Sequence, residues 1–163
     1  MLKILENENK NYKEVALCAI KELPYFCVGC CAYGYKPKLE RTKEDVRTNT
    51  LDYEKSKTLE DFRDRTGKTL QPSGICPCLI QKNKVTCCGI HQKVIGSKED
   101  LRKNFCNISY ECPTAKFFSR MDSEEKKSFV SFILSKKLDQ YTYSLQIFNG
   151  SLFRDYSENG KSD

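Results

Sequence analysis

Ten cysteines in a chain of 163 residues are the feature that most restricts how this sequence can fold. This content is far above ordinary usage. It is typical either of an oxidising compartment, where thiols form disulfides, or of a reducing one, where they bind metal. Cys18 stands apart, and the other cysteines fall into short groups. The grouped cysteines are Cys27, Cys30, Cys31, Cys76, Cys78, Cys87, Cys88, Cys106 and Cys112.

The amino-terminal segment favours the reducing alternative. Residues 1–15 carry charge throughout and contain no apolar run as long as that of a signal peptide. No stretch approaches the roughly 20 apolar residues of a membrane span. We therefore expect a cytoplasmic protein with no membrane partner, in which metal rather than disulfides occupies the thiols.

Spacing within the groups suits thiolate metal sites. Two residues separate Cys27 from Cys30, so one turn can present both sulfurs to one ion. His91, the only histidine, follows Cys88 at the same spacing; a ligand role and a structural role are both open for it. We expect zinc or an iron–sulfur cluster as cofactor. The candidate metal ligands are Cys27, Cys30, Cys31, Cys76, Cys78, Cys87, Cys88, His91, Cys106 and Cys112.

Two pairs of adjacent cysteines limit how the sulfurs are shared. Neighbouring side chains diverge, so both members of Cys30-Cys31 or of Cys87-Cys88 rarely bind one ion. Each pair either serves two neighbouring metals, or one member binds while the other packs. One site with redundant cysteines and two four-coordinate sites are both compatible with the pattern.

Helical signals are present at the amino-terminal end and in the charged middle of the chain. Residues 12–23 predict a short amphipathic helix whose apolar stripe contains Cys18, which we expect to be a buried core residue and not a ligand. Residues 36–68 are highly charged and free of cysteine, and form either a helical insertion or a mobile loop. Within them, Thr58 indicates a helix start and Gly67 a helix end.

The remaining segments predict turns, a helix and a hairpin. Residues 72–121 contain few long apolar runs, so we expect turns and short strands there. Residues 122–137 predict a helix capped by Asp122 and Glu125. Residues 141–156 predict a β-hairpin, because apolar residues alternate before an Asn-Gly pair.

Together these elements predict an α+β fold. It is a small, irregular, metal-stapled cysteine-rich domain with a carboxy-terminal helix and β-hairpin. We expect one domain over residues 1–163. Its cysteine-cluster region spans 25–121 and contains the charged insertion 36–68, and its helix and hairpin span 122–156.

The positive charge of the chain is concentrated on the cysteine-rich stretch. Residues 76–121 contain eight Lys or Arg against three Asp or Glu, which leaves a net charge of +5, whereas the whole chain carries +6. Nearby cations stabilise thiolate sites, which are anionic. A solvated basic surface and a nucleic-acid footprint are the other interpretations.

The sequences FCVGCC, GICPCLIQKNKVTCCGIH and DLRKNFC resemble the YkgJ-like family of cysteine-cluster proteins, described as zinc- or iron-chelating domains. The resemblance covers residues 25–112 and implies metal chelation. It departs from the family at Lys93-Val94, where Arg-Pro is expected, and at Leu101, where a cysteine is expected. The matching positions are Cys27, Cys30 and Cys31, then Cys76-Pro77-Cys78-Leu79, then Cys87 or Cys88 with His91, then Arg102 with Cys106.

These observations favour a metal-binding cysteine-cluster protein that acts as an accessory, structural or redox module. An iron–sulfur enzyme or enzyme subunit is one alternative, because Cys112-Pro113 is similar to the end of a ferredoxin ligand run. A zinc-stapled RNA-binding module is another, because aromatic residues and lysines flank the first cysteine group. Whether the chain is an enzyme is left open. We expect another protein as partner, with a nucleic acid as the alternative.

Overall fold

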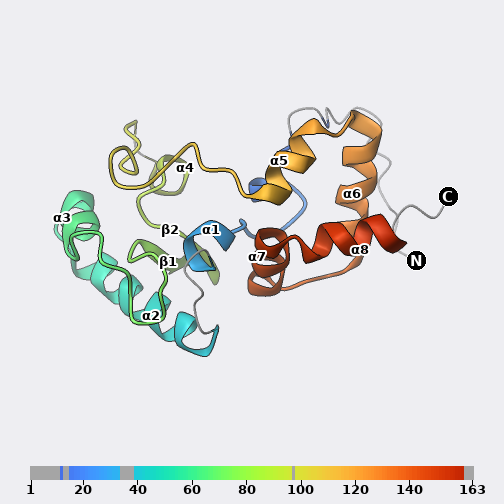
Figure 1. Ribbon diagram of the computed structural model, residues 1–163. Coiled ribbons are helices and arrows are strands. Elements are labelled where there is room, and N and C mark those ends of the chain that lie inside the picture. The colour runs from blue at the N-terminus through green and yellow to red at the C-terminus, as the bar shows by residue number, and fades with distance from the viewer. Residues whose placement is uncertain (1–11, 13–14, 34–38, 97, 160–163) are drawn as a thin grey trace.

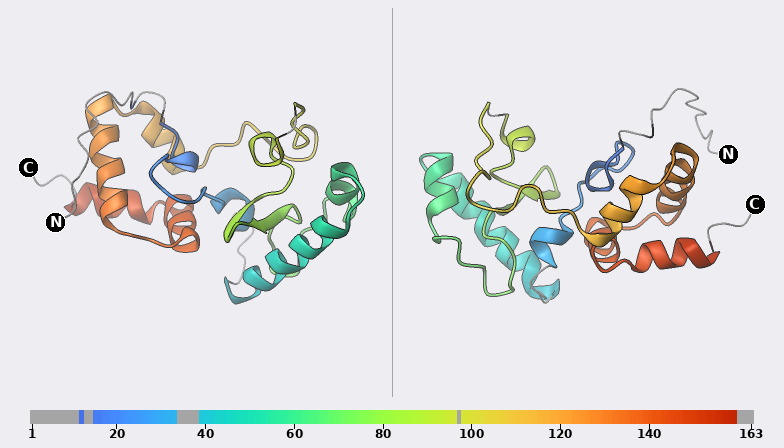
Figure 2. Two further views of the ribbon diagram at one scale, coloured as in Figure 1. Left: turned by 180° about the vertical axis from the view of Figure 1, so that it is seen from behind. Right: turned by 45° about the horizontal axis from the view of Figure 1, so that its top comes forward.

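The computed structural model describes residues 12, 15–33, 39–96 and 98–159. Helices and a two-stranded antiparallel sheet make up the structure, which confirms the predicted α+β class. Figure 1 shows two lobes with helix α1 between them, and the two further views agree (Figure 2). The elements are η2 Leu17–Ala19, α1 Gly29–Ala32, α2 Leu39–Lys55, α3 Leu59–Asp64, β1 Leu79–Lys82, β2 Val85–Cys88, α4 Gln92–Ile95, α5 Pro113–Arg120, α6 Ser123–Ser135, α7 Gln140–Asn149 and α8 Ser151–Asn159.

The hairpin lobe, which comprises residues 39–96 and 98–106, is built on strands β1 and β2. Leu79 pairs with Cys88 and Lys82 with Val85, so two residues form the turn between the strands. The turn residues Asn83 and Lys84 both have positive φ angles, of 51° and 64°. A two-residue hairpin turn with this backbone twists in the direction that the strands require.

Helices α2 and α3 cover this sheet. The fully buried side chain of Asn49 in α2 donates a hydrogen bond to the carbonyl of Leu79, at 3.0 Å, which fixes the helix against β1. Thr58 accepts a hydrogen bond from the backbone N–H of Asp61 and begins α3 as predicted. The described part of the charged insertion is therefore helical over most of its length, and the helical alternative is confirmed there.

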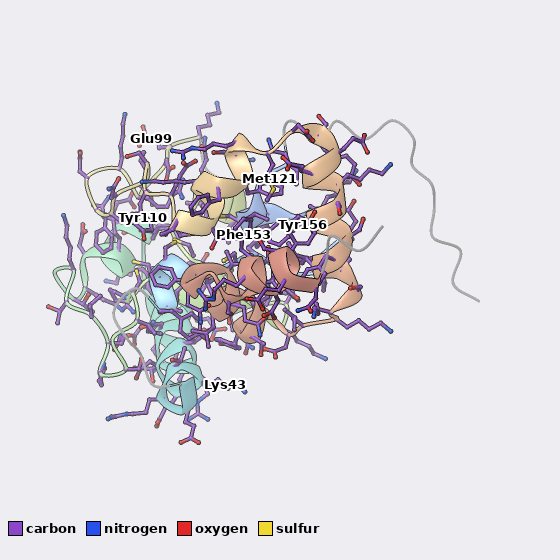
Figure 3. All side chains as sticks on the ribbon, turned by 45° about the vertical axis from the view of Figure 1, so that its right-hand side comes forward. Lys43, Glu99, Tyr110, Met121, Phe153 and Tyr156 are labelled. Atoms are coloured by element: carbon purple, nitrogen blue, oxygen red, sulfur yellow. The ribbon has the colours of Figure 1, made fainter. Side chains whose placement is uncertain are left out.

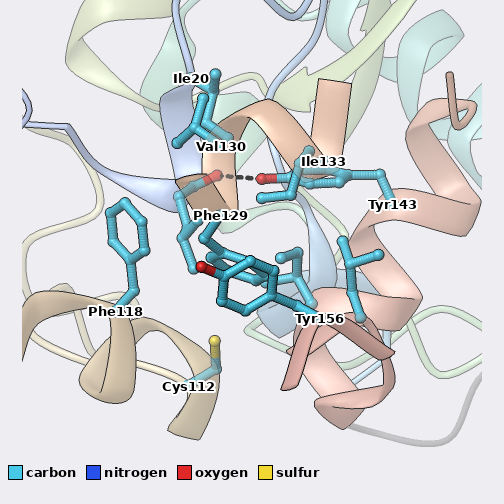
Figure 4. Close-up of a cluster of buried hydrophobic side chains, with 11 residues drawn as sticks. Ile20, Cys112, Phe118, Phe129, Val130, Ile133, Tyr143 and Tyr156 are labelled. Carbon is cyan, nitrogen blue, oxygen red and sulfur yellow. Dashed lines mark hydrogen bonds between the residues drawn. The ribbon is translucent and has the colours of Figure 1, made fainter. Parts of the chain in front are cut away.

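The helical lobe, residues 113–159, has an aromatic core. Phe129 of α6 is fully buried, and its ring centroid lies 4.9 Å from that of Tyr156 and 6.0 Å from that of Phe118. Asp122 and Glu125 form the predicted capping box at the start of α6. Figure 4 shows this cluster and Figure 3 shows the side chains of α8 facing α5 and α6.

The predicted hairpin over residues 141–156 is wrong, because this segment forms helices α7 and α8. Asp139 caps α7 by accepting hydrogen bonds from two backbone N–H groups, and Tyr143 and Ile147 form its buried face at helical spacing. Gly150, with a φ of 76°, ends α7 in the left-handed conformation. A glycine after asparagine suits this helix end as well as it suits a hairpin turn, because both need positive φ.

The predicted helix over residues 12–23 is also wrong within the part that the structure describes. Leu17–Ala19 forms a short helical turn of the 3-10 type, and its preceding residue makes no side-chain capping bond. The described residues that follow it, up to Leu23, form no helix. The residues buried against the helical lobe are Leu17 and Ile20. An apolar helical stripe containing Cys18 was expected there. Tyr143 donates a hydrogen bond to the carbonyl of Leu17 at 2.7 Å (Figure 4), so contacts with the lobe hold this turn in place.

The two lobes meet where α1 and the hairpin lie against α7. A Cβ atom on Gly29 would lie 2.6 Å from the carbonyl oxygen of Ser144, so only glycine permits this close approach. The Gln140 amide donates to the carbonyls of Phe26 and Thr86, and it accepts from the N–H of Thr86 at 2.9 Å. These bonds join the segment before α1, the hairpin and the helical lobe at one place.

Within the described residues, the helices are too short or too polar to cross a lipid bilayer.

Candidate metal centre

All ten cysteines have free thiols, and their surroundings divide most of them into two groups. The division is by position: one group lies around the hairpin, and the other lines a single cavity. Electrostatic influence crosses between the groups, because the charge of Cys30 acts to raise the pKa of Cys31, Cys76 and Cys106. We name them the hairpin thiol group and the cavity thiol group. The hairpin thiol group comprises Cys31, Cys76, Cys78, Cys88 and Cys106, and the cavity thiol group comprises Cys18, Cys27, Cys30 and Cys112.

Separate parts of the fold deliver the hairpin thiol group. Cys31 lies in α1, and its carbonyl accepts a hydrogen bond from the N–H of Cys76, at 2.9 Å, just before β1. Cys88 ends β2, and Cys106 lies in the segment that returns from the hairpin lobe toward α5 (Figure 1). The hydrogen bond to Cys30 raises the pKa of Cys31 most, and burial and the charges on Cys76 and Cys88 raise it further. Sulfurs far apart in sequence therefore share one environment.

Backbone N–H groups point at several of these sulfurs. The N–H of Cys78 donates to the Cys76 sulfur over 3.5 Å, and the N–H of Ile90 donates to the Cys88 sulfur. In both cases the donor lies two residues after the cysteine. Such bonds stabilise a thiolate more than a thiol, and they tune the sulfur ligands of metal centres. The local turns are thus suited to hold ionised cysteines.

Two thiol–thiol hydrogen bonds shift the pKa values of their two partners in opposite directions. The bond from Cys31 lowers the pKa of Cys30 to about 7, and the bond from Cys78 lowers the pKa of Cys76. The same bonds raise the pKa of Cys31 and of Cys78 far above the ordinary range, with burial as the second cause. One sulfur of each pair therefore carries negative charge most readily, and a cation is needed before both ionise.

Two arginines supply positive charge beside the hairpin thiol group. Burial raises the pKa of Cys88 and Cys106, and the positive charge of Arg102 partly opposes this effect. Arg102 also forms a salt bridge of 2.6 Å with Asp100. Arg65 contributes to the lowered pKa of Cys76. Its guanidinium lies 3.0 Å from Asp52 and donates to the carbonyl of Pro77 at 2.7 Å. These two contacts hold it beside the turn formed by residues 76–78.

Arg65 was missed by the sequence analysis. It lies in the charged insertion, where nothing in the sequence distinguishes it from other solvated charges. Its functional position depends on tertiary contacts with α2 and with the turn before β1. No local pattern carries that information.

Cys87 and His91 have other environments. Cys87 is 5% exposed and packs with Phe62 and Ile80 in the core of the hairpin lobe, against which Cys88 also packs in part. Burial raises the pKa of Cys87, and no other cysteine contributes to this shift. The Nδ1 atom of His91 accepts a hydrogen bond from the N–H of Lys93 at 3.1 Å and caps α4. Burial lowers the pKa of His91, so its ring is neutral at physiological pH.

The cavity thiol group includes Cys18, which was expected to be buried in an apolar helical face. Cys18 is exposed, and its carbonyl accepts a hydrogen bond from the N–H of Cys27 at 3.0 Å. Protein atoms around its sulfur raise its pKa to about 11, and the charges of Cys30 and Cys112 contribute. The expectation of a buried, isolated Cys18 is wrong, because the chain folds back between Cys18 and Cys27 instead of forming a continuous helix.

Among the described residues, no three His, Cys, Asp or Glu side chains are arranged as a ready-made metal site. The thiol–thiol hydrogen bonds orient some of the sulfurs toward each other. The donor chemistry nevertheless suits a thiophilic metal, because soft sulfurs, backbone N–H donors and cations lie together.

Comparison with protein-family models, with curated proteins and with solved structures finds no match to this chain.

Proposed function

We propose that this chain is a metal-binding protein whose centre forms in the hairpin thiol group, with Cys31, Cys76, Cys88 and Cys106 as the ligands. The observation that carries the proposal is the mutual electrostatic influence of these sulfurs, which come from α1, the start of β1, the end of β2 and the segment before α5, together with the hydrogen bond between the backbones of Cys31 and Cys76. A metal bound there would tie four distant parts of the chain together. The proposed role is that of an accessory, structural or redox module.

The choice of these four sulfurs follows from their neighbours. Cys76 and Cys88 each accept a hydrogen bond from a backbone N–H. Burial raises the pKa of Cys88 to about 12, and the hydrogen bond partly offsets this effect. Cys78 is fully buried and donates its proton toward Cys76, so it supports a ligand in the manner of an outer-sphere hydrogen bond. Cys87 packs in the apolar core and is excluded from the centre.

Zinc and an iron–sulfur cluster both suit four thiolates. Four thiolates on one Zn²⁺ leave a net charge of about −2. The guanidinium groups of Arg65 and Arg102 reduce the electrostatic cost of that charge. Visible absorption separates the alternatives, because an iron–sulfur protein is coloured and a zinc protein is not.

The adjacent residues Cys87 and Cys88 provide a matched test. Protein purified without oxygen is analysed for zinc and iron, and each variant is compared with the parent chain. Cys88→Ala is expected to lose one metal centre, and Cys87→Ala is expected to keep it. Equal metal content in the Cys88→Ala variant and the parent, or a parent chain without any bound metal, would overturn the proposal.

A further inference from the structure

A cavity of about 250 Å³ lies where the amino-terminal turn η2 meets α1 and the beginning of α5. All four cysteines of the cavity thiol group line it: Cys18, Cys27, Cys30 and Cys112. They come from three segments of the chain, and Cys112 is 82 residues after Cys30 in the sequence. The cavity is therefore bordered by cysteines from distant parts of the chain, outside the hairpin thiol group.

We propose that Cys18, Cys27, Cys30 and Cys112 bind a second thiophilic metal ion, at a centre separate from the one in the hairpin thiol group. The proposal shares the thiolate chemistry of the proposed function and rests on it only for the class of metal. Its ligands are different residues. Each sulfur releases its proton when it binds the metal, so no oxidant or reductant is required.

The backbone around Cys27 is already arranged for a metal knuckle. Two residues separate Cys27 from Cys30, and the N–H of Gly29 donates to the Cys27 sulfur. The hydroxyl of Ser144 also donates to this sulfur, while it accepts the N–H of Val28 at 3.0 Å. Ser144 is fully buried in α7. This hydroxyl therefore fixes the knuckle against the helical lobe.

Cys112 contributes from the beginning of α5. It occupies the capping position of that helix, yet its side chain makes no capping hydrogen bond. Its sulfur is consequently not used by the helix, and it lies at the edge of the buried cluster in Figure 4. The positive end of an eight-residue helix favours an anionic centre beside it.

Lys126 provides a positive charge in the wall of the same cavity. The residue is buried, and its ammonium lies 5.5 Å from the centroid of the Phe118 ring. A cation beside a cavity stabilises an anionic centre within it. Four thiolates on a divalent ion would form such a centre. The cavity thus combines the ligands with a cation that suits a thiolate centre.

Alkylation tests the proposal on the intact parent chain. Cys18 and Cys30 are exposed, so iodoacetamide reaches their free thiols, whereas metal-bound thiolates are protected. The raised pKa of Cys18 slows its reaction, so the alkylation is continued until the chelated protein is fully labelled. The chain is purified without oxygen, loaded with zinc and alkylated with or without a chelator, and the labelled cysteines are mapped by mass spectrometry. We expect Cys18 to be protected in the zinc form and labelled after chelation.

Variants then separate this centre from the one in the hairpin thiol group. Bound zinc is expected to fall from two equivalents to one in Cys112→Ser, with Cys18 becoming labelled. It is expected to fall to one in Cys88→Ala with Cys18 still protected. Circular dichroism confirms that the helices remain in each variant.

Three outcomes distinguish the two proposals. A parent chain that binds no metal refutes both. One equivalent that Cys88→Ala loses and Cys112→Ser keeps, with Cys18 labelled in the zinc form, overturns the second centre alone. A disulfide between Cys18 and another cysteine in protein that was purified without oxygen and loaded with zinc would also overturn it.

Discussion

The two lobes of this molecule are stabilised by different chemistry. The core of the helical lobe is built largely from aromatic and large aliphatic side chains, with Phe129 and Tyr143 completely or almost completely buried. The core of the hairpin lobe contains two cysteines, Cys78 and Cys87, among a few aliphatic residues and Phe62. Aromatic rings bury much more apolar surface than thiols do. The hairpin lobe therefore has less packing energy with which to order its loops.

This difference in packing indicates which part of the chain depends on metal for its stability. Ordering a residue opposes folding by about 1–2 kcal/mol of backbone entropy, and a structural zinc site contributes roughly 10–16 kcal/mol in small domains. Segments such as residues 98–106 have no regular strand or helix to offset that entropy. The proposed centre in the hairpin thiol group lies where packing is weakest.

Metal removal is expected to have the largest effect. After treatment with a chelator, amide hydrogen exchange should lose its protection at residues 76–106, whereas Phe129 to Ile133 in α6 should keep part of theirs. The reason is that α6 is buried against aromatic rings, whereas the hairpin lobe is held by its sulfurs. Hydrogen exchange measured by mass spectrometry checks this. Uniform protection of both lobes after complete metal removal would show that they do not differ in this way.

Phe129→Ala is expected to destabilise the helical lobe by about 3–5 kcal/mol, because it removes a fully buried ring and leaves a cavity. Chemical denaturation followed by circular dichroism measures the loss. Phe117→Ala is the matched control. Phe117 is 52% exposed and stacks on Phe153 at 5.5 Å, so its removal should cost about 1 kcal/mol. Equal effects of the two variants would contradict the assignment of the core.

Gly29→Ala is expected to weaken the junction of the lobes by about 1–3 kcal/mol, because the added methyl group would overlap the Ser144 carbonyl and the Phe148 side chain. Gly67→Ala is the control, since it meets no neighbouring atom and introduces only backbone strain, about 1 kcal/mol, at a φ of 55°. Thermal unfolding of the metal-loaded protein measures both. A junction that tolerates Gly29→Ala better than the control would show that the lobes do not meet closely there.

Asp122→Ala is expected to have the smallest effect, about 1 kcal/mol, because it removes one half of the capping box of α6. Glu124→Ala is the comparison, because Glu124 lies in the same turn but outside the box. Urea titration followed at the helical signal resolves the difference. The loss should appear in the helical lobe alone, with the metal content unchanged.

Local signals in the sequence predicted those elements whose ends are determined by their own side chains. The capping box of Asp122 and Glu125 located α6, and Thr58 located the start of α3. The same kind of reasoning failed at Asn149-Gly150, because positive φ serves a helix end and a hairpin turn equally. The hairpin that does exist turns at Asn83-Lys84, where the second residue gives little indication of a positive φ.

The candidate site, too, was predicted from the sequence only in part. Sequence spacing identified most of the cysteines and separated Cys87 from Cys88 in principle. It did not place Cys18 with Cys112, because their proximity depends on a turn packed against α7 and on the position of α5. Arg65 escaped notice for the same reason. Contacts of this kind arise from the tertiary fold, and no local pattern in the sequence encodes them.

Helix α1 connects the hairpin thiol group with the cavity thiol group. Cys30 and Cys31 are successive residues of this four-residue helix, and a hydrogen bond joins their thiols, one from each group. Fixing one of them restricts the backbone of the other, so the freedom lost on the first binding event is not lost again on the second. Thermodynamic linkage then makes occupancy of either centre increase the affinity of the other by the same factor. In the proposed two-centre protein, metal uptake would therefore be cooperative and would follow a steep, sigmoidal isotherm.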